Sequence, residues 1–296
     1  MAGPLQDNPP TANIHITNGA SDWLWAVCAL MSVSMLFTLF WSHMQPLGQR
    51  AFHHTATVIL FVSAVAYFAM ASDLGQTAVA TEFRDTSPGS TRNVFWVRYI
   101  QWAINGPLII IMVLLTTGLA LSDVFLTAFM TLAIVVMGLV GALTPSSYKW
   151  GFFVFGLFAL FYVFTSLWGL GSRTSLNAGG ATHRRFFNTG SGWISFIWPL
   201  YFICWGLSEG GNRISPTGEM IFYGILDLFA GPLFLFTHLW ALRSLDYAAF
   251  GLQSGKASDY AGVTGTGVGA GPAGAGTGTN GVGTSTGRKE AEAGVV

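Results

Sequence analysis

The chain has 296 residues, of which 52% are hydrophobic and only 9% are charged. Soluble domains carry roughly 25% charged residues, so this composition indicates a membrane protein. The formal net charge is +0, which gives no electrostatic case for binding nucleic acid or an acidic partner. Cys28 and Cys204 both fall in apolar stretches, which predicts two buried thiols and excludes a disulfide framework.

Seven continuous apolar stretches follow one another along the chain. They lie at residues 21–43, 54–74, 95–118, 122–143, 150–171, 189–208 and 217–243. Each is long enough to cross about 30 Å of hydrocarbon as a helix, whereas the strands of a membrane barrel are about ten residues long and alternate in polarity. The sequence therefore predicts an all-α membrane protein with a seven-transmembrane-helix bundle at residues 21–246.

The segments between these stretches differ in length and polarity. Residues 1–20 are polar and lack the basic and apolar regions of a signal peptide, so we expect an extracellular tail. The connection at 75–94 is long and polar, with room for a small hairpin. The connections at 119–121 and 144–149 are short, which predicts antiparallel helix neighbours. Residues 172–188 are expected to form a basic loop.

Positive charges and composition predict the orientation. With the N-terminus outside, the inner segments carry eight of the 13 Lys and Arg residues. Arg184 and Arg185, next to His183, lie close to a predicted helix end and favour an outer N-terminus and a cytosolic C-terminus. Residues 247–296 are rich in Gly, Ala and Thr without apolar periodicity, which predicts a disordered cytosolic tail.

Polar residues occur inside two of the apolar stretches. Arg98, Gln101 and Asn105 are spaced i, i+3, i+7 and share one helix face. Asp227 lies within the seventh stretch, where a carboxylate is costly and by default marks a functional site. We expect Asp227 to be ion-paired or water-bridged to Arg98, with Gln101 and Asn105 nearby. The alternative is a polar contact that fixes helix register and binds no ligand.

Aromatic residues share a face of the sixth stretch. Trp198, Tyr201 and Trp205 are spaced i, i+3, i+7, a pattern that by itself more often indicates core packing. Together with Tyr67, Trp102 and a buried carboxylate, it outlines an aromatic-walled cavity at mid-membrane depth, which is the default place for a small molecule. The predicted cavity residues are Tyr67, Trp102, Asn105, Trp198, Tyr201, Trp205, Asp227 and Gly231.

The motifs in these helices resemble those of microbial rhodopsins. They are Arg-Tyr-x-x-Trp-x-x-x-x-Pro at 98–107, Trp-x-x-Tyr-x-x-x-Trp at 198–205 and Leu-Asp-x-x-Ala at 226–230. Tyr-Phe-Ala-Met-Ala-Ser-Asp-Leu-Gly in the second stretch and Trp-Gly-Leu-Ser-Glu-Gly-Gly-Asn before the seventh are similar to fungal members. The resemblance covers about residues 20–245 and implies their seven-helix fold.

The resemblance also identifies a missing group. In that family a lysine directly after Leu-Asp-x-x-Ala binds retinal as a Schiff base, and here that position is Gly231. The three lysines of the chain, all outside the apolar stretches, are Lys149, Lys256 and Lys289. The resemblance places the proton acceptor at Gln101 and the donor at Met112, neither of which exchanges protons near neutral pH. We therefore expect no covalent cofactor and no light-driven pumping.

Other polar positions of the family are retained. The resemblance assigns Arg98 as the family's arginine, Asp227 as its second counter-ion, and Glu209 and Glu219 as its outer proton-release carboxylates. The predicted buried polar network is Arg98, Gln101, Asp227, Glu209 and Glu219. The sequence shows no motif for an enzyme or a metal site.

The pattern resembles the lysine-less opsin-related proteins of fungi, which include stress-induced plasma-membrane heat shock proteins. This implies a stress-linked interaction or chaperone-like role at the plasma membrane, with a proton ATPase as a partner for some members. A homo-oligomer is a further partner that the sequence allows. One alternative is non-covalent binding of a sterol or retinoid, since Gly231 leaves room in the former retinal cavity. A second alternative is passive ion or proton transport along the polar network.

Overall fold

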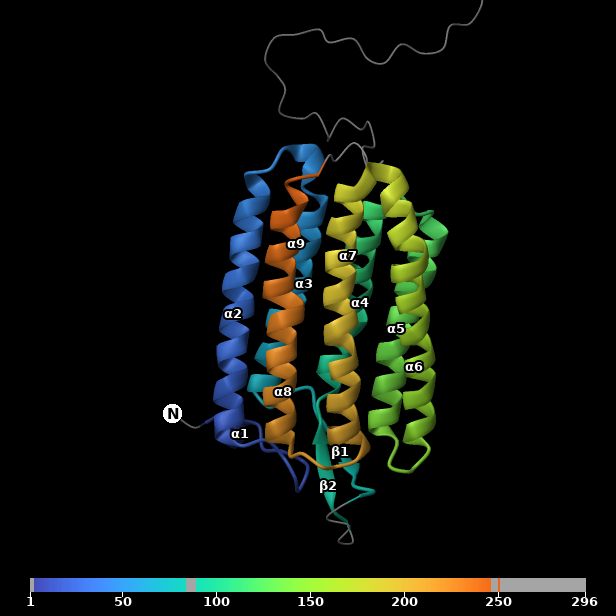
Figure 1. Cartoon of the computed structure of the whole chain (residues 1–296). Coiled ribbons are helices and arrows are strands. Elements are labelled where there is room, and N and C mark those ends of the chain that lie inside the picture. Colours follow the sequence, from blue (N-terminus) through green and yellow to red (C-terminus); the bar gives the residue numbers. More distant parts are fainter. Residues whose placement is uncertain (1–2, 84–88, 246–249, 251–296) are drawn as a thin grey trace, which may run out of the picture. The chain divides into compact units, whose positions relative to one another are not determined.

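The computed structural model describes residues 3–83, 89–245 and 250, apart from the side chain of Leu47. The tail predicted at 247–296 lies outside these residues except for Phe250. Within the described residues, six helices are long and apolar enough to cross a membrane. One of them, Lys149–Gly210, has 62 residues and turns back on itself at Gly179 and Gly180, so it supplies two limbs of the bundle (Figure 1). With these two limbs counted separately, the described residues contain seven membrane-length segments.

The first four membrane-length segments pack as consecutive neighbours, and a long connection joins the second to the third. They are α2 (Asn18–His43), α3 (Ala51–Ala71), α4 (Trp96–Leu114) with its extension η2 (Leu115–Thr117), and α5 (Leu121–Leu143). Two short helices, α1 (Pro4–Asp7) and η1 (Leu47–Gln49), precede α2 and α3. The Thr17 side chain accepts a hydrogen bond from the Ala20 amide, which caps the first orphan donors of α2 and explains why that helix begins at Asn18.

The remaining segments contain local widenings of the helix. The fifth comprises α6 (Lys149–Thr165) and η3 (Ser166–Gly171), and the sixth comprises most of α7 (Ser172–Trp205) with η4 (Gly206–Gly210). The seventh is α8 (Pro216–Leu228), η5 (Phe229–Leu233) and α9 (Phe234–Leu242). The segments η3, η4 and η5 are π-helical, a geometry that frequently occurs at functional sites. Gly231 lies in η5.

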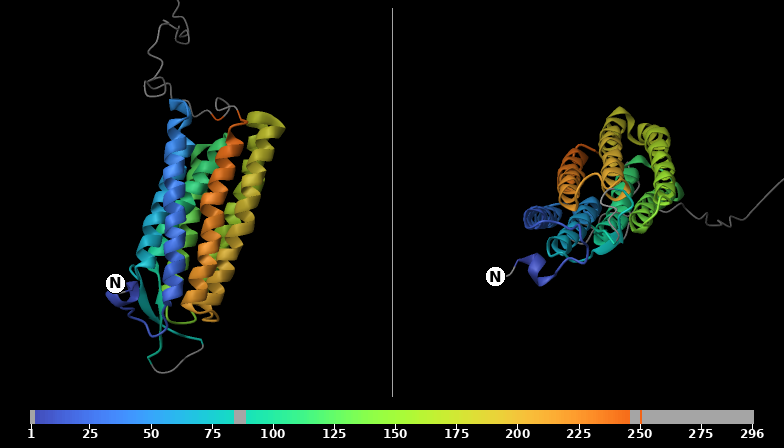
Figure 2. Two further views of the ribbon diagram at one scale, coloured as in Figure 1. Left: turned by 90° about the vertical axis from the view of Figure 1, so that its left-hand side faces the viewer. Right: turned by 90° about the horizontal axis from the view of Figure 1, so that it is seen from below.

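The helices close into a ring, seen end-on in Figure 2. Consecutive helices from α2 to α6 pack against each other, α7 packs against η3 and α8, and α8 contacts α2 to complete the circuit. Every polar side chain on an inward face is therefore enclosed by protein. Many large apolar side chains point outward instead, including Phe40, Phe125 and Phe158 (67%, 74% and 67% exposed), as expected for helices that face lipid.

The prediction of a loop at residues 172–188 is wrong. This segment is helical on both sides of a sharp bend, at which Gly179 and Gly180 leave the helical conformation. Gly180 has φ +74, a left-handed conformation that glycine adopts without the clash of a Cβ atom. The fifth and sixth helices therefore extend past their apolar stretches, and Arg184 and Arg185 lie on α7 just after the bend (Figure 1).

A small antiparallel hairpin, β1 (Thr77–Ala80) and β2 (Thr91–Val94), lies at the other end of the bundle. This confirms the hairpin expected in the polar connection at 75–94. The N-terminal segment is more ordered than a simple tail, because Ile14 bridges to Arg92 of β2 and Ile16 is fully buried. We call the end of the bundle that carries this hairpin the hairpin end. The opposite end, at the Gly179–Gly180 bend of α7, is called the bend end.

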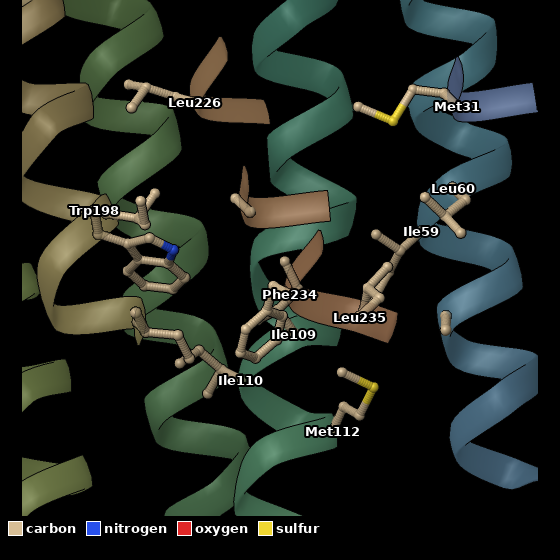
Figure 3. Packing of buried hydrophobic residues seen from close by; sticks show 14 of the residues in the cluster. Met31, Ile59, Leu60, Ile109, Ile110, Met112, Trp198, Leu226, Phe234 and Leu235 are labelled. Carbon is tan, nitrogen blue, oxygen red and sulfur yellow. The ribbon is translucent and has the colours of Figure 1, made fainter. Parts of the chain in front are cut away.

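The apolar core runs between the helices toward the bend end. Figure 3 shows part of it, with Met31 from α2, Ile109 and Met112 from α4, and Phe234 and Leu235 from α9. All five are at most 2% exposed. Tightly packed apolar residues thus fill one half of the interior, and the buried charges described next lie closer to the hairpin end.

Candidate functional site

The carboxylate of Asp227 is held by hydrogen bonds from three other helices. Tyr67 of α3 donates to Oδ2 at 2.7 Å, and Tyr201 of α7 donates to Oδ1 at 2.6 Å. From α4, Trp102 Nε1 donates to Oδ1 at 3.1 Å and Gln101 Nε2 approaches Oδ2 at 3.4 Å. Asp227 is 1% exposed, so these donors replace water around a charge that would otherwise be costly to bury.

Arg98 lies beside Asp227 without a hydrogen bond to it. The Arg98 Nη1 atom is 3.9 Å from Asp227 Oδ1. Its guanidinium carbon lies 3.1 Å from the centroid of the Tyr223 ring, and its Nε and Nη1 atoms have no hydrogen-bond partner within the described residues. The expected pair is therefore a close approach of charges, and the hydrogen bonds to Asp227 come from tyrosine, tryptophan and glutamine side chains.

Asn105, the third polar residue of the predicted α4 face, belongs to a separate contact. Its Nδ2 donates to Ser63 Oγ at 2.9 Å and to the Ile59 carbonyl at 3.2 Å. Gln101 Nε2 also reaches Ser63 Oγ, at 3.3 Å. This polar contact joins α3 to α4 and constrains their register.

Glu209 and Glu219 form a second polar group toward the hairpin end. Glu209 accepts hydrogen bonds from Tyr99 at 2.6 Å, Ser208 at 2.6 Å and Tyr223 at 3.2 Å. Glu219 is paired with Arg92 of β2 at 2.5 Å. The predicted network is thus divided in two, and Arg98 lies between its halves because it stacks on Tyr223, a donor to Glu209.

Two buried cations of this group were not predictable from hydropathy. Arg92 is 4% exposed, and its Nη1 also donates to the Ile214 carbonyl at 2.6 Å. Lys149 is 2% exposed, with Nζ 3.3 Å from the Glu209 carbonyl oxygen and 3.7 Å from Glu82 Oε2. Both residues stand outside the apolar stretches, where hydropathy predicts exposed loop residues. The burial of Arg92 could have been inferred from its position in the expected hairpin, since a strand that packs against the bundle buries one of its faces.

The space next to Gly231 contains the side chain of Met31. A Cβ atom added at Gly231 would lie 3.6 Å from Met31 Cε and 3.7 Å from Met31 Sδ, which is ordinary van der Waals contact. Met31 is fully buried. Methionine is flexible and fills irregular gaps in a core, so one residue of α2 accounts for this space. Sequence periodicity cannot identify Met31, since it does not indicate which α2 residue faces α8 and η5.

An apolar cavity of about 100 Å³ lies against the aromatic residues. It is enclosed by α4, α5, α6 and α7, and its lining includes Trp102, Trp198, Tyr201 and Trp205 from the predicted set. The side chains of Phe153 and Phe202 add two further walls. The other four predicted residues, which do not line this cavity, are Tyr67, Asn105, Asp227 and Gly231. The four aromatic residues of the predicted set that line the cavity form one of its walls. Asp227 and Gly231 lie outside the lining, whereas Arg98, 3.9 Å from Asp227, is part of it.

The described residues contain no cluster of three or more His, Cys, Asp or Glu side chains that could bind a metal. Chemically, the interior presents one carboxylate saturated by neutral donors, two carboxylates near buried cations, and a small aromatic cavity. The hydrogen bonds to Asp227 come entirely from the chain's own side chains, so its oxygens are satisfied without an additional cation.

Comparison with known proteins supports the family resemblance. The sequence profile of the bacteriorhodopsin-like protein family matches residues 18–244. Protein FDD123 of Trametes versicolor is 51% identical over 255 residues, which covers 86% of this chain and 89% of that protein. The opsin-like protein carO of Fusarium fujikuroi is 41% identical, with coverage of 83% and 81%. The 30 kDa heat shock protein of Saccharomyces cerevisiae is 34% identical, with coverage of 75% and 72%.

Solved structures of light-driven proton pumps have the same fold. The pump rhodopsin of Coccomyxa subellipsoidea is 28% identical, with a TM-score of 0.73 and coverage of 77% of this chain and 98% of that chain. The pump of Leptosphaeria maculans is also 28% identical with a TM-score of 0.73, covering 78% and 99%. The family match spans all seven membrane-length segments, so this chain belongs to the bacteriorhodopsin-like protein family and is a multi-pass membrane protein related to fungal opsin-like and heat shock proteins.

Proposed function

We propose that this opsin-related membrane protein works without a retinal Schiff base, through contacts with lipid or protein. The arrangement around Asp227 is the observation that carries this proposal. Both carboxylate oxygens accept hydrogen bonds from protein side chains, and Met31 lies against Gly231, where the resemblance places the lysine. A protonated Schiff base next to Asp227 would need a nearby amine, and the lysine described in the bundle, Lys149, is at the hairpin end bonded to the Glu209 carbonyl.

The stress-linked part of the proposal rests on the relatives. One relative is named a heat shock protein, and it aligns with three quarters of this chain. We infer a similar interaction or chaperone-like role at the plasma membrane, with modulation of a proton ATPase as its specific form. The outward apolar faces, such as that bearing Phe125 and Phe129 on α5, supply the lipid- and partner-contacting surface.

Retinal reconstitution tests the absence of photochemistry. The purified protein is incubated with all-trans-retinal and examined for a visible absorption band. Any Schiff base is then reduced with borohydride, which would leave retinal permanently attached to the protein. We expect neither the band nor attached retinal in the wild type. The Gly231→Lys/Met31→Ala variant is the positive control, because the second change makes room for a lysine side chain that Met31 would otherwise contact. A retinal adduct on the wild-type protein would overturn the proposal.

The interaction role needs a separate measurement in cells. Deletion of the gene in a host that expresses it should alter acid extrusion and survival during heat or acid stress. Chemical crosslinking of the membrane should recover the proton ATPase with the tagged chain. Normal extrusion and survival, together with no crosslinked partner, would contradict this role while leaving the retinal result unaffected.

The aromatic cavity favours a second candidate function, non-covalent binding of an apolar molecule. Its lining is almost wholly aromatic and aliphatic, which suits such a ligand. Its volume of about 100 Å³ is below the roughly 300–1,000 Å³ of sites that enclose a drug-sized ligand, so a sterol or retinoid would insert only one end without rearrangement. Passive transport is not favoured, because apolar residues such as Met112 and Val113 (1% and 0% exposed) occupy α4 toward the bend end, beyond the polar network.

Mass spectrometry of lipid extracts from the purified protein tests ligand binding. Gly156→Leu should reduce any co-purified apolar molecule, because a Cβ at Gly156 already approaches Phe202 at 3.3 Å on the cavity wall. Gly151→Leu is the matched control on the same helix, since a Cβ there meets nothing within 4 Å. Equal ligand recovery from both variants would exclude the cavity as the binding site.

A further inference from the structure

A polar cleft of about 270 Å³ lies between α7 and α9 at the bend end. Its lining includes Arg185, Thr182, Thr189 and His238, together with the aromatic side chains of Trp193 and Phe234. A second hollow of about 440 Å³ shares Arg185 and Thr189 with it and is also lined by Arg184 and Asn188. Arg185 therefore stands where the two hollows meet.

Several polar groups of the cleft, the exposed side chains of Arg185 and Thr182 among them, have no polar partner among the residues that the structure describes. The side chains of Arg185 and Thr182 make no hydrogen bond or ion pair with any described residue. His238 is 4% exposed, and its Nε2 has no hydrogen-bond partner within the described part of the chain. Its ring lies against Gly190, where a Cβ would be 3.5 Å from Nδ1. A buried imidazole without a partner is costly, which suggests that another group normally completes it.

The bend end is strongly basic. Its described arginines are Arg50, Arg173, Arg184, Arg185 and Arg243. Asp123, at the start of α5, is the acidic residue described there. Among the described residues of this end, five positive charges against one negative charge favour anions, and the low-dielectric walls of the cleft strengthen their field. A carboxylate or phosphate is therefore the complementary charge for Arg185.

The level of the cleft corresponds to a membrane interface. Arg243 stacks on the rings of Trp240 at 4.5 Å and Trp41 at 4.8 Å. Trp240 is 67% exposed on the outer surface of α9. Tryptophan and arginine concentrate where hydrocarbon meets headgroups. The polar mouth of the cleft and its aromatic walls thus match the two parts of a lipid molecule.

We propose that this cleft binds the phosphate headgroup of an anionic phospholipid. Arg185 and Thr182 donate hydrogen bonds to phosphate oxygens, and an acyl chain lies along Trp193 and Phe234. Basic pockets between transmembrane helices bind such headgroups. A soluble phosphate offers the same charge but nothing to contact the aromatic walls, so the lipid fits both halves of the site.

Lipid competition on the full-length protein tests the proposal. The chain is purified in detergent, and its bound lipids and melting temperature are followed by native mass spectrometry and thermal unfolding. The probes are dioctanoyl phosphatidylinositol 4-phosphate, dioctanoyl phosphatidylcholine and inorganic phosphate. We expect the phosphoinositide to be retained and to raise the melting temperature at concentrations where phosphatidylcholine and phosphate have no effect.

Three variants locate the site. Arg185→Gln should weaken phosphoinositide binding by about ten-fold, because a hydrogen bond to a charged group contributes about 1.5–3 kcal/mol and each 1.4 kcal/mol is a factor of ten. Thr182→Val removes a donor without changing charge and should weaken it several-fold. Arg173→Gln is the matched control, since Arg173 is an exposed arginine of the same end that lines neither hollow.

Three results would overturn the proposal. Equal weakening by Arg185→Gln and Arg173→Gln would mean that general positive charge, and not this cleft, attracts the lipid. Equal retention of phosphatidylcholine, whose headgroup has no net charge, would show that the site does not recognise an anionic headgroup. Stabilisation by inorganic phosphate at the same concentration as the lipid would identify a soluble anion as the ligand. None of these outcomes bears on the retinal test.

Discussion

The hydroxyl of Tyr201 provides a direct test of how the buried carboxylate is stabilised. It makes the shortest hydrogen bond to Asp227, 2.6 Å to Oδ1. Tyr201→Phe deletes this donor and keeps the ring that packs against Trp102 and Tyr223 at centroid distances of 4.9 Å and 6.0 Å. The variant therefore isolates the hydrogen bond from the aromatic packing.

The expected cost follows from the remaining contacts of Oδ1. Hydrogen bonds to charged groups contribute about 1.5–3 kcal/mol, whereas neutral bonds between membrane helices contribute about 0.6 and at most about 1.7 kcal/mol. After the substitution Oδ1 keeps Trp102 Nε1 at 3.1 Å, and Arg98 Nη1 at 3.9 Å can approach. We therefore expect a loss near the low end of the charged range, about 1.5 kcal/mol, or a fall in Tm of about 3–6 °C for a chain of this size.

Thermal unfolding in detergent, followed by circular dichroism, measures this loss. Tyr148→Phe is the matched control, because Tyr148 is 82% exposed and the same atom is removed. If the hydroxyl acts through the Asp227 charge, its effect shrinks when Asp227→Asn is already present. Equal melting temperatures for the Tyr201 and Tyr148 variants, or strict additivity with Asp227→Asn, would refute this account of the carboxylate.

Two further substitutions test the two ends of the bundle. Burial raises the pKa of Asp73, which lies outside the membrane-spanning segments, from 3.8 to about 6, while His15 and Asn93 oppose the rise. The folded protein therefore binds this proton more tightly than the unfolded chain, so stability falls as pH rises through about 6. Asp73→Asn should stabilise the protein at pH 7.5 by on the order of 1 kcal/mol and should have no such effect at pH 4. Asparagine also tolerates the φ of 57 at this position, so a gain that persists unchanged at pH 4 would contradict the charge explanation. Gly180→Ala should lower the unfolding free energy by about 1–2 kcal/mol, because the φ of Gly180 is +74, although a Cβ atom there meets nothing within 4 Å. Gly169→Ala is the control and should be neutral, because a Cβ atom there is equally unobstructed and φ is not positive. Similar melting temperatures for both glycine variants would exclude backbone strain at the bend.

The membrane-spanning segments were predictable because hydrocarbon depth imposes long apolar runs. The same criterion failed at residues 172–188, since polar helices that continue beyond the membrane contain no apolar signal. Gly179 and Gly180 were the only local cue, and a pair of glycines does not distinguish a bend between two helices from a loop. Hydropathy thus located the spans but not the ends of the fifth and sixth helices.

For the interior, sequence spacing indicated shared faces but not contacts between helices. The shared face of Arg98 and Gln101 on α4 was predicted, and both approach Asp227. The side chains that make the short hydrogen bonds to Asp227 were not predictable, because Tyr67 and Tyr201 come from helices whose rotation the sequence does not specify. Met31 was missed for the same reason. A cavity was expected next to Gly231, whereas the described cavity lies among residues of α4, α5, α6 and α7.

We infer that the residues at positions 101 and 231 are coupled by charge. The resemblance places an acidic proton acceptor at Gln101 and a Schiff-base cation at Gly231, so this chain lacks one negative and one positive group at the same depth. The polar groups on either side of Arg98 contain the carboxylates of Asp227, Glu209 and Glu219 and the cations Arg92, Arg98 and Lys149. A fourth buried carboxylate, Asp73, has His15 and Asn93 as its neighbours. The polar groups around Arg98 hold as many cations as carboxylates, and we infer that a neutral amide at position 101 accompanies the absence of an amine at position 231.

This coupling makes a prediction about adding the acid back. Gln101→Glu would place a second carboxylate beside Asp227, since Gln101 Nε2 is already 3.4 Å from Asp227 Oδ2. Two adjacent carboxylates do not both ionise without a further cation, so we expect a loss of about 3 kcal/mol at pH 7 that diminishes as the medium is acidified. Gln101→Met, which fills similar volume without charge, should cost less and show no such pH dependence. Adding Gly231→Lys with Met31→Ala should recover part of the loss, because the lysine supplies the missing cation. Loss of stability that is independent of pH, or that the lysine does not reduce, would show that position 101 is constrained by packing and not by the charge of the interior.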